Sequence, residues 1–121
     1  MCGVLFAFEK KIGSNTLYQR GQDALTKLKH RGPDEQKLCF QDNWVIGHTR
    51  LSIVDLAGSH QPMISPDGTK YLSFNGEIYN FRELRKKLEH KWKFSTTGDT
   101  EVLLAGLTLY GTDFIKSLEG M

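Results

Sequence analysis

Apolar residues follow strand and helix spacings along the chain, and the first part of the pattern predicts one element of each kind. VLFAF is a short apolar run of strand-forming residues and predicts a buried strand over residues 2–9. The pattern then changes to helical spacing, and the apolar positions on the inner face of the predicted helix are Leu17, Leu25 and Leu28. Ser14 and Asn15 are suited to cap this helix, and Gly32 with Pro33 is typical of its end.

The middle of the chain predicts further strands. They are expected around KLCF and over WVIGHTRLSIVDL, residues 44–56. A loop through GSHQPMISPDG then leads to a last strand over residues 71–74.

Two helices are expected after these strands. Asn80 and Glu83 have the spacing of a capping box, and the helix that follows has an apolar stripe of Phe81, Leu84 and Leu88. A last helix starts near Asp99 or Thr100 and stops at Gly111, and its core positions are Val102, Leu103, Leu107 and Tyr110. Because helices and strands are interleaved without strict alternation, the pattern predicts an α+β domain.

Composition narrows the class of protein. The 121 residues are enough for one domain, 39% are hydrophobic, and a net charge of +2 does not fit a nucleic-acid binder. No apolar run approaches the roughly 20 residues of a membrane span, and no secretory signal is visible. Two cysteines without a CxxC pair suggest neither a metal site nor a disulfide framework, so we expect a cytoplasmic protein. Cys39 is interpreted as a buried, unreactive thiol, and the basic stretch 82–93 as a solvated helix face.

Cys2 stands directly behind the initiator methionine. If Met1 is removed, as is usual before a small residue, Cys2 carries both a thiol and a free α-amine. An α-amine with a pKa of about 7.7–8.0 can accept the proton of a thiol with a pKa of about 8.5. One residue would then supply both nucleophile and base. The alternative is an incidental cysteine at the start of a strand.

FNGEIYN, residues 74–80, has two interpretations. Asn-Gly between apolar residues is the strongest short-range hairpin signal, so a type I′ turn is the default. Alternatively, the Asn75 amide and the Gly76 N–H group converge as two donors on an oxyanion.

Two charged residues also leave alternatives open. Arg50 lies in a strand-like segment, where it pairs either with a protein carboxylate or with the carboxylate of a ligand. Asp99 either caps a helix or receives a ligand ammonium group. HRGPD, residues 30–34, is interpreted first as helix-end punctuation. A thiol, an oxyanion pair, a cation and an anion together fit a free amino acid with a reactive side-chain carbonyl, and glutamine is the obvious candidate.

Five motifs in order resemble the class II glutamine amidotransferases, whose nucleophile is an amino-terminal cysteine. They are MCG at the start, HRGPD at 30–34, RLSIVDL at 50–56, NGEIYN at 75–80 and GDTEVLL at 98–104. The resemblance covers the whole chain, and HRGPD, RLSIVDL and NGEIYN are similar to the asparagine synthetase branch. It implies a four-layer αββα sandwich of the N-terminal-nucleophile type.

The resemblance also implies roles for individual residues. Cys2 would be the nucleophile, with Asn75 and Gly76 holding the oxyanion. Arg50 would bind the α-carboxylate of L-glutamine, and Glu77 and Asp99 its ammonium group. The pocket would further be lined by the backbone of Leu51, Ser52, Ile53 and Val54.

The resemblance implies a partner as well. Ammonia would pass to a synthetase domain or chain, where ATP and Mg would serve asparagine formation, whereas residues 1–121 would need no cofactor. We expect this sequence to be the N-terminal portion of a glutaminase domain, truncated on its C-terminal side, and a homo-oligomer is possible. The alternatives are an inactive remnant that binds glutamine or a partner chain, and an amidotransferase for a sugar or cell-envelope acceptor.

Overall fold

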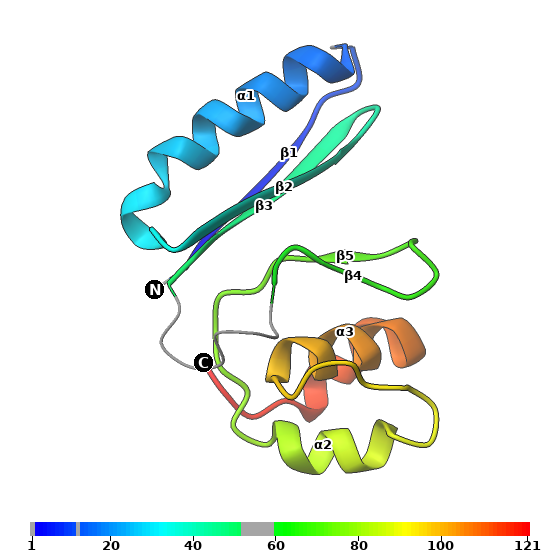
Figure 1. The fold of residues 1–121 in the computed structure, drawn as a ribbon. Helices are drawn as coiled ribbons and strands as arrows, with labels where there is room; N and C mark the ends of the chain where they lie inside the picture. Colours follow the sequence, from blue (N-terminus) through cyan, green and yellow to red (C-terminus); the bar gives the residue numbers. More distant parts are fainter. Residues whose placement is uncertain (1, 12, 52–59) are drawn as a thin grey trace. The chain divides into compact units, whose positions relative to one another are not determined.

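The computed structural model describes residues 2–11, 13–51 and 60–121, and the chain divides into two compact units (Figure 1). Unit 1 comprises Met1–Val54 with Ser73–Asn75, and unit 2 comprises Asp55–Leu72 with Gly76–Met121. Both units combine helices with antiparallel strands, so the predicted α+β class is confirmed.

Unit 1 is built on a three-stranded antiparallel sheet. Its strands are β1 (Gly3–Phe8), β2 (Glu35–Gln41) and β3 (Trp44–Arg50), in the spatial order β1-β3-β2. The central strand pairs Thr49 with Gly3 of β1 and Arg50 with Glu35 of β2. The predicted strands are present, but β3 ends at Arg50 instead of continuing to residue 56, and residues 52–59 lie outside the described part of the chain.

Helix α1 (Ser14–Lys27) covers one face of this sheet, with Leu17 and Leu25 buried as predicted. Glycine at position 47 favours this close packing, since a Cβ there would lie 3.0 Å from Leu25 Cδ1, closer than ordinary van der Waals contact. The prediction that Ser14 or Asn15 caps the helix is wrong. The N-cap is Gly13, which has no side chain to donate or accept a hydrogen bond.

The prediction of a buried first strand is wrong for the face of the sheet that points away from α1. Val4, Phe6 and Phe8 are 48, 65 and 51% exposed. Side chains alternate between the faces of a strand, and within the described part of unit 1 α1 is the helix that covers the sheet. The apolar run therefore forms the strand as predicted, but every second side chain faces away from α1.

Unit 2 is organised around helix α3 (Asp99–Tyr110), whose Val102 and Ala105 are fully buried. Helix α2 (Phe81–Leu88) and the 3₁₀ turn Gly111–Ser117 pack against α3. Strands β4 (Met63–Ile64) and β5 (Tyr71–Leu72) form a short antiparallel hairpin, and β4 contacts α3. The loop predicted before residue 71 therefore contains a strand, and the strand predicted over 71–74 ends at Leu72.

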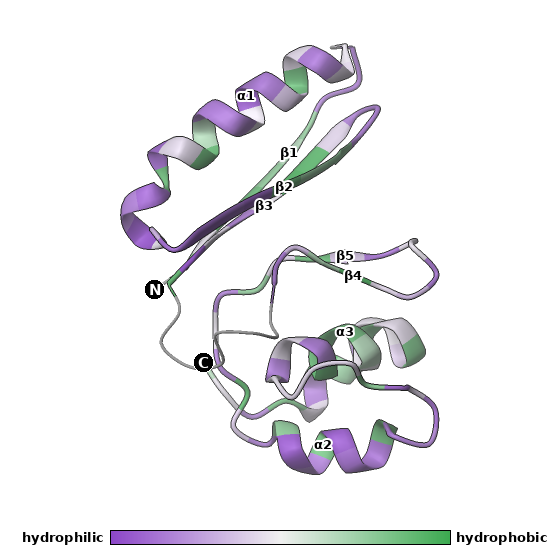
Figure 2. Ribbon diagram, viewed as in Figure 1, coloured by the Kyte–Doolittle hydropathy of each residue, from purple (hydrophilic) through white to green (hydrophobic). Residues whose placement is uncertain are grey.

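The distribution of polar and apolar residues over the helices of unit 2 follows the sequence pattern. Figure 2 shows a largely hydrophilic α2 and a more hydrophobic α3. Leu84 and Leu88 form the buried side of α2, and the basic stretch is exposed at Arg82, Lys86, Lys87, Lys91 and Lys93, as predicted. Among the described residues, no helix combines the length and the apolar character that crossing a membrane requires.

Three details of the unit 2 helices differ from the predictions. Asn80 is the N-cap of α2, but its amide accepts from Glu119 N at 3.1 Å and donates to Ser117 O at 2.9 Å, so no capping box forms. Helix α3 begins at Asp99, as predicted, but its N-cap is Gly98, so the interpretation of Asp99 as the cap is wrong. Tyr110 is 46% exposed and does not belong to the core.

The predicted stop of the last helix is confirmed. Gly111 ends α3 with φ 65° and ψ −156°. This region of backbone conformation is open almost only to glycine, so the residue type fixes the end of the helix.

Candidate active site

Cys2 lies directly before β1 and is held through its backbone. Its N–H group donates to Asn75 Oδ1 at 3.1 Å, and its carbonyl oxygen accepts from Arg31 Nε at 3.3 Å. The next N–H group, of Gly3, donates to Thr49 Oγ1 at 3.0 Å. Cys2 is half-buried, so this residue is fixed at a defined place beside the sheet, although chain ends are commonly poorly ordered.

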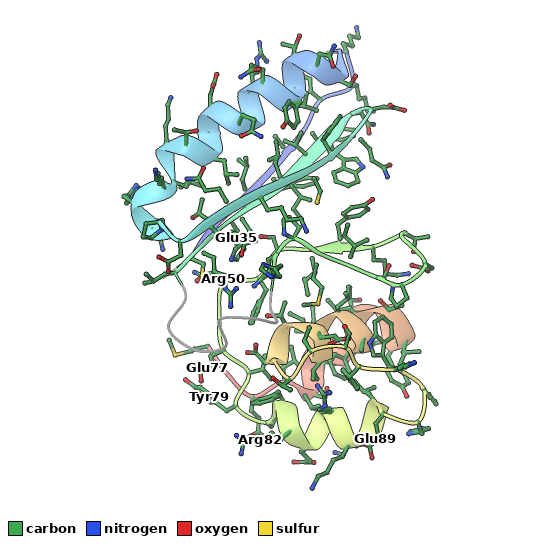
Figure 3. The ribbon with its side chains drawn as sticks, in the orientation of Figure 1. Glu35, Arg50, Glu77, Tyr79, Arg82 and Glu89 are labelled. Atoms are coloured by element: carbon green, nitrogen blue, oxygen red, sulfur yellow. The ribbon has the colours of Figure 1, made fainter. Side chains whose placement is uncertain are left out.

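Arg50 lies at the same end of this sheet. Gly3 pairs with Thr49, so continuing the register by one residue places Cys2 opposite Arg50. Arg50 Nη1 lies 3.7 Å from Glu35 Oε2, and Figure 3 shows the two labelled side chains close together. The first alternative for Arg50, a protein carboxylate as partner, is therefore confirmed.

The HRGPD motif does more than end a helix. Arg31 reaches the carbonyl oxygen of Cys2 from the 3₁₀ turn Lys29–Arg31, which follows α1. Gly32 has an extended φ of −151° and is not a left-handed helix stop. Its role is close approach, because a Cβ at this position would lie 2.3 Å from the Thr49 carbonyl carbon. The motif therefore packs the end of the helix closely against β3, next to Cys2.

The hairpin expected at Asn75 and Gly76 does not form. Ser73–Asn75 has no regular secondary structure, Gly76 is a bend, and β5 already ends at Leu72. The Asn75 side chain instead accepts the hydrogen bond from Cys2 N. Asn75 belongs to unit 1 and Gly76 to unit 2, so the local hairpin signal is overridden where the chain passes from one unit to the other.

His48 and Ser73 extend this part of unit 1. His48 is 1% exposed, and its Nδ1 lies 2.9 Å from Ser73 Oγ, which donates to the Gly47 carbonyl oxygen at 3.1 Å. Burial lowers the pKa of His48 to about 4; Glu35 opposes this shift and Arg50 adds to it. The imidazole is therefore uncharged at neutral pH.

In unit 2, Asp99 lies on the first turn of α3 and Glu77 lies on an extended segment. Asp99 Oδ2 accepts a hydrogen bond from the Ile78 N–H group at 2.9 Å. Glu77 is exposed, and its N–H and C=O groups pair with Met121 at 2.9 and 3.0 Å. The structure thus brings Asp99 next to the segment that carries Glu77, within one unit.

The backbone residues expected to line the pocket are described only in part. Leu51 is half-buried and outside any strand, whereas Ser52, Ile53 and Val54 lie outside the described residues. Cys39 is half-buried instead of buried, and burial raises the pKa of its thiol despite the opposing charge of Lys37. Within residues 2–11, 13–51 and 60–121, no group of three His, Cys, Asp or Glu side chains is arranged to hold a metal ion.

The sequence did not lead us to the side-chain hydrogen bonds that His48, Thr49 and Ser73 form in this part of unit 1. A signal for His48 was present in GHTR of β3, since alternation places His48 and Arg50 on the face opposite Gly47 and Thr49. Ser73 carried no such signal, because its contact with His48 joins positions 25 residues apart.

The family of the chain follows from comparison with known proteins. A family model described as "Glutamine amidotransferase domain" matches residues 1–121, and the chain belongs to this family. Among similar curated proteins are asparagine synthetase B [glutamine-hydrolyzing] of Escherichia coli (strain K12), at 36% identity over 121 residues, and asparagine synthetase [glutamine-hydrolyzing] of Asparagus officinalis, at 38% over 122. Asparagine synthetase [glutamine-hydrolyzing] 1 of Bacillus subtilis (strain 168) is 39% identical over 127 residues.

Each of these alignments covers 100% of this chain but only 20–22% of the relative. The chain therefore spans about a fifth of the length of the curated relatives that it matches. The family resemblance carried by the five motifs is confirmed.

Proposed function

We propose that this domain hydrolyses L-glutamine to L-glutamate and ammonia through a thioester on Cys2. The observation that carries the proposal is the fixed position of Cys2, whose backbone nitrogen faces the Asn75 amide at 3.1 Å in a chain of the glutamine amidotransferase family. The relatives named above are glutamine-hydrolysing by their names, which supports the same substrate.

The first step uses Cys2 alone. Once Met1 is removed, the α-amine takes the thiol proton, and the sulfur adds to the side-chain amide carbon of glutamine. The α-ammonium then gives its proton to the departing nitrogen, which leaves as ammonia while the γ-glutamyl thioester forms. Water adds to this thioester, glutamate leaves, and the thiol is regenerated.

Asn75 and Gly76 are proposed as the oxyanion donors. The Asn75 carbonyl oxygen already accepts from Cys2 N, and this contact directs the NH₂ end of the same amide away from the nitrogen of Cys2. The NH₂ group of Asn75 and the N–H group of Gly76 are therefore neighbouring donors in the sequence. Loss of one such donor typically costs roughly 10²–10³ in rate.

The proposal assigns substrate binding to three charged side chains. Arg50, which the strand register places opposite Cys2, would bind the α-carboxylate. In unit 2, Asp99 and Glu77 would receive the α-ammonium group. Asp99 Oδ2 is bonded to Ile78 N, and its Oδ1 lies 3.4 Å from Thr100 Oγ1, a weak contact that leaves accepting capacity.

A second part of the proposal concerns a longer protein, organised like the relatives named above. Residues 1–121 would be the N-terminal portion of a glutaminase domain with an αββα sandwich fold. The exposed side chains of Val4, Phe6 and Phe8 are suited to a second layer over the sheet. Ammonia would pass to a synthetase domain that uses ATP and Mg to form asparagine.

Labelling of the nucleophile tests this function. Protein freed of Met1 is incubated with a diazoketone analogue of glutamine, and the modified cysteine is located by peptide mass mapping. We expect alkylation at Cys2, while Cys39 serves as an internal control because burial raises its pKa. The Cys2→Ala variant should fold normally and release no glutamate. Folded, Met-free protein in which Cys2 stays unmodified would contradict the proposal.

A further inference from the structure

His48 combines deep burial with an incomplete set of hydrogen bonds. Its side chain is 1% exposed, and its Nε2 atom has no hydrogen-bond partner within the part of the chain that the structure describes. Its Nδ1 atom lies 2.9 Å from Ser73 Oγ. A buried imidazole with one bonded and one unbonded nitrogen needs an explanation, because an unpaired polar atom in a core is costly.

The hydrogen bonds around Ser73 define the tautomer of this imidazole. Ser73 Oγ lies 3.1 Å from the Gly47 carbonyl oxygen, which can only accept, so the hydroxyl proton points to that carbonyl. The same oxygen must then accept from His48, so the proton of the neutral ring is on Nδ1. Nε2 is left as the unprotonated nitrogen, and an empty acceptor costs less than a buried donor without a partner.

The bond between His48 and Ser73 ties the segment Ser73–Asn75 to the central strand. Ser73 and Asn75 are two positions apart, and both side chains bond to the sheet end that holds Cys2: Ser73 to β3, and Asn75 to the nitrogen of Cys2. This segment has no regular secondary structure of its own. Side-chain contacts therefore help to define its path.

We infer that His48 is a positioning residue of the active site, whose Nδ1–H group holds Ser73 and thereby fixes the Asn75 amide beside the Cys2 nitrogen. The inference deepens the proposed glutaminase function and rests on it. His48 does not act on the substrate itself. It acts by keeping the Asn75 amide in place, with its Oδ1 atom 3.1 Å from the nitrogen of Cys2, the proposed base.

Paired substitutions separate the two nitrogens of the ring. His48→Asn keeps an N–H donor near the Nδ1 position, whereas His48→Gln places its amide near the Nε2 position and leaves Ser73 without a donor. Ser73→Ala removes the acceptor. His90→Gln, at an exposed position after α2, is the matched control for a histidine change.

Glutaminase kinetics on Met-free protein supply the first readout. We expect Ser73→Ala and His48→Gln each to lower kcat by roughly 10- to 100-fold with little change in KM, since a small misplacement of a catalytic group has that effect. The double variant should be no worse than either single one, and His48→Asn should recover most of the rate. Parental kcat in both Ser73→Ala and His48→Gln would overturn the inference and leave the proposed function intact.

A second readout does not depend on activity. The ¹⁵N signals of the His48 ring in the unaltered protein should show a protonated Nδ1 and an unprotonated Nε2, and Ser73→Ala should shift the side-chain amide signals of Asn75. A ring protonated on Nε2, or Asn75 signals that stay unchanged in Ser73→Ala, would overturn the inference. Parent protein that releases no glutamate would refute the proposed function, and these signals would still decide the placement of His48.

Discussion

Glu101 shows how one buried carboxylate can organise a loop. It is 4% exposed and accepts hydrogen bonds from Trp92 Nε1 at 3.3 Å, from Ser95 N at 2.9 Å and from Thr96 Oγ1 at 2.7 Å, among others. Burial alone would raise the pKa of Glu101, but the hydrogen bonds from Thr96, Ser95 and Trp92 outweigh it, and the pKa is lowered. The carboxylate fixes the chain just before α3, the helix whose first residue is Asp99.

We predict that Glu101→Gln destabilises the protein by about 2–4 kcal/mol, because the new NH₂ group would face donors instead of accepting from them. Urea unfolding at neutral pH measures the change. Glu89→Gln, at an exposed position after α2, is the control and should stay within about 0.5 kcal/mol. An equal, small effect of both changes would refute the prediction.

A second prediction at this scale concerns the protonation of His48. Its pKa is about 4 in the folded protein against 6.5 for an ordinary histidine, so between these values the unfolded chain binds more protons. The free energy of unfolding should therefore fall as the pH is lowered from 6.5 to 4, by an amount on the order of 3 kcal/mol for this group. The charged groups that face the ring are Glu35, Arg50 and Lys37, the cross-strand neighbour.

Comparison of the parent with His48→Asn isolates this contribution from that of the carboxylates. Urea unfolding at several pH values should give a shallower pH dependence for the variant between pH 4 and 6.5. The same slope in both proteins would mean that His48 is not responsible.

At the scale of elements, the contact between the end of α1 and β3 connects the helix to the site. Gly32 lies against the backbone of Thr49, and Arg31, directly before it, bonds to the Cys2 carbonyl oxygen. Displacement of this turn would affect both the packing of unit 1 and the hold on Cys2.

Gly32→Ala should therefore destabilise the protein by about 3 kcal/mol, since its Cβ would overlap the Thr49 backbone, which cannot move aside without breaking the sheet. Gly13→Ala is the matched control, because a Cβ there meets nothing within 4 Å. Thermal and urea unfolding of the two variants give the comparison. A Gly32→Ala protein as stable as Gly13→Ala would show that the turn packs more loosely than the structure indicates.

At the scale of the whole molecule, periodic patterns predicted the elements better than their ends or surroundings. Strands β1 to β3 and the three helices follow from apolar spacing, which each element needs in order to bury one side. Exposure of Phe6 could not be read from the same run, because an apolar strand does not reveal how many of its faces are covered. The capping box predicted at Asn80 does not form, because the distant residues Glu119 and Ser117 bind its side-chain amide.

Candidate site residues could be named from the sequence where chemistry restricts the residue type, as for Cys2, Arg50 and Asn75, and their roles stay predictions. The contacts of Ser73 were not, because only folding brings it to β3. Even for Arg50, the sequence left two partners open, and the Glu35 contact became visible only through the pairing of β2 with β3. Motifs thus indicate candidate groups, and strand pairing determines which of them meet.

Three successive residues of β3 each serve a different part of this arrangement: His48 bonds to Ser73, Thr49 to Gly3, and Arg50 to Glu35. A slip of β3 by one residue against its neighbours would turn each of these side chains to the opposite face. The slipped species would keep its secondary structure, but all three contacts would be lost together and Val45 would leave the buried face. Under the proposed function, glutamine turnover per molecule would then measure correct strand alignment in a preparation, where far-ultraviolet circular dichroism would detect no fault.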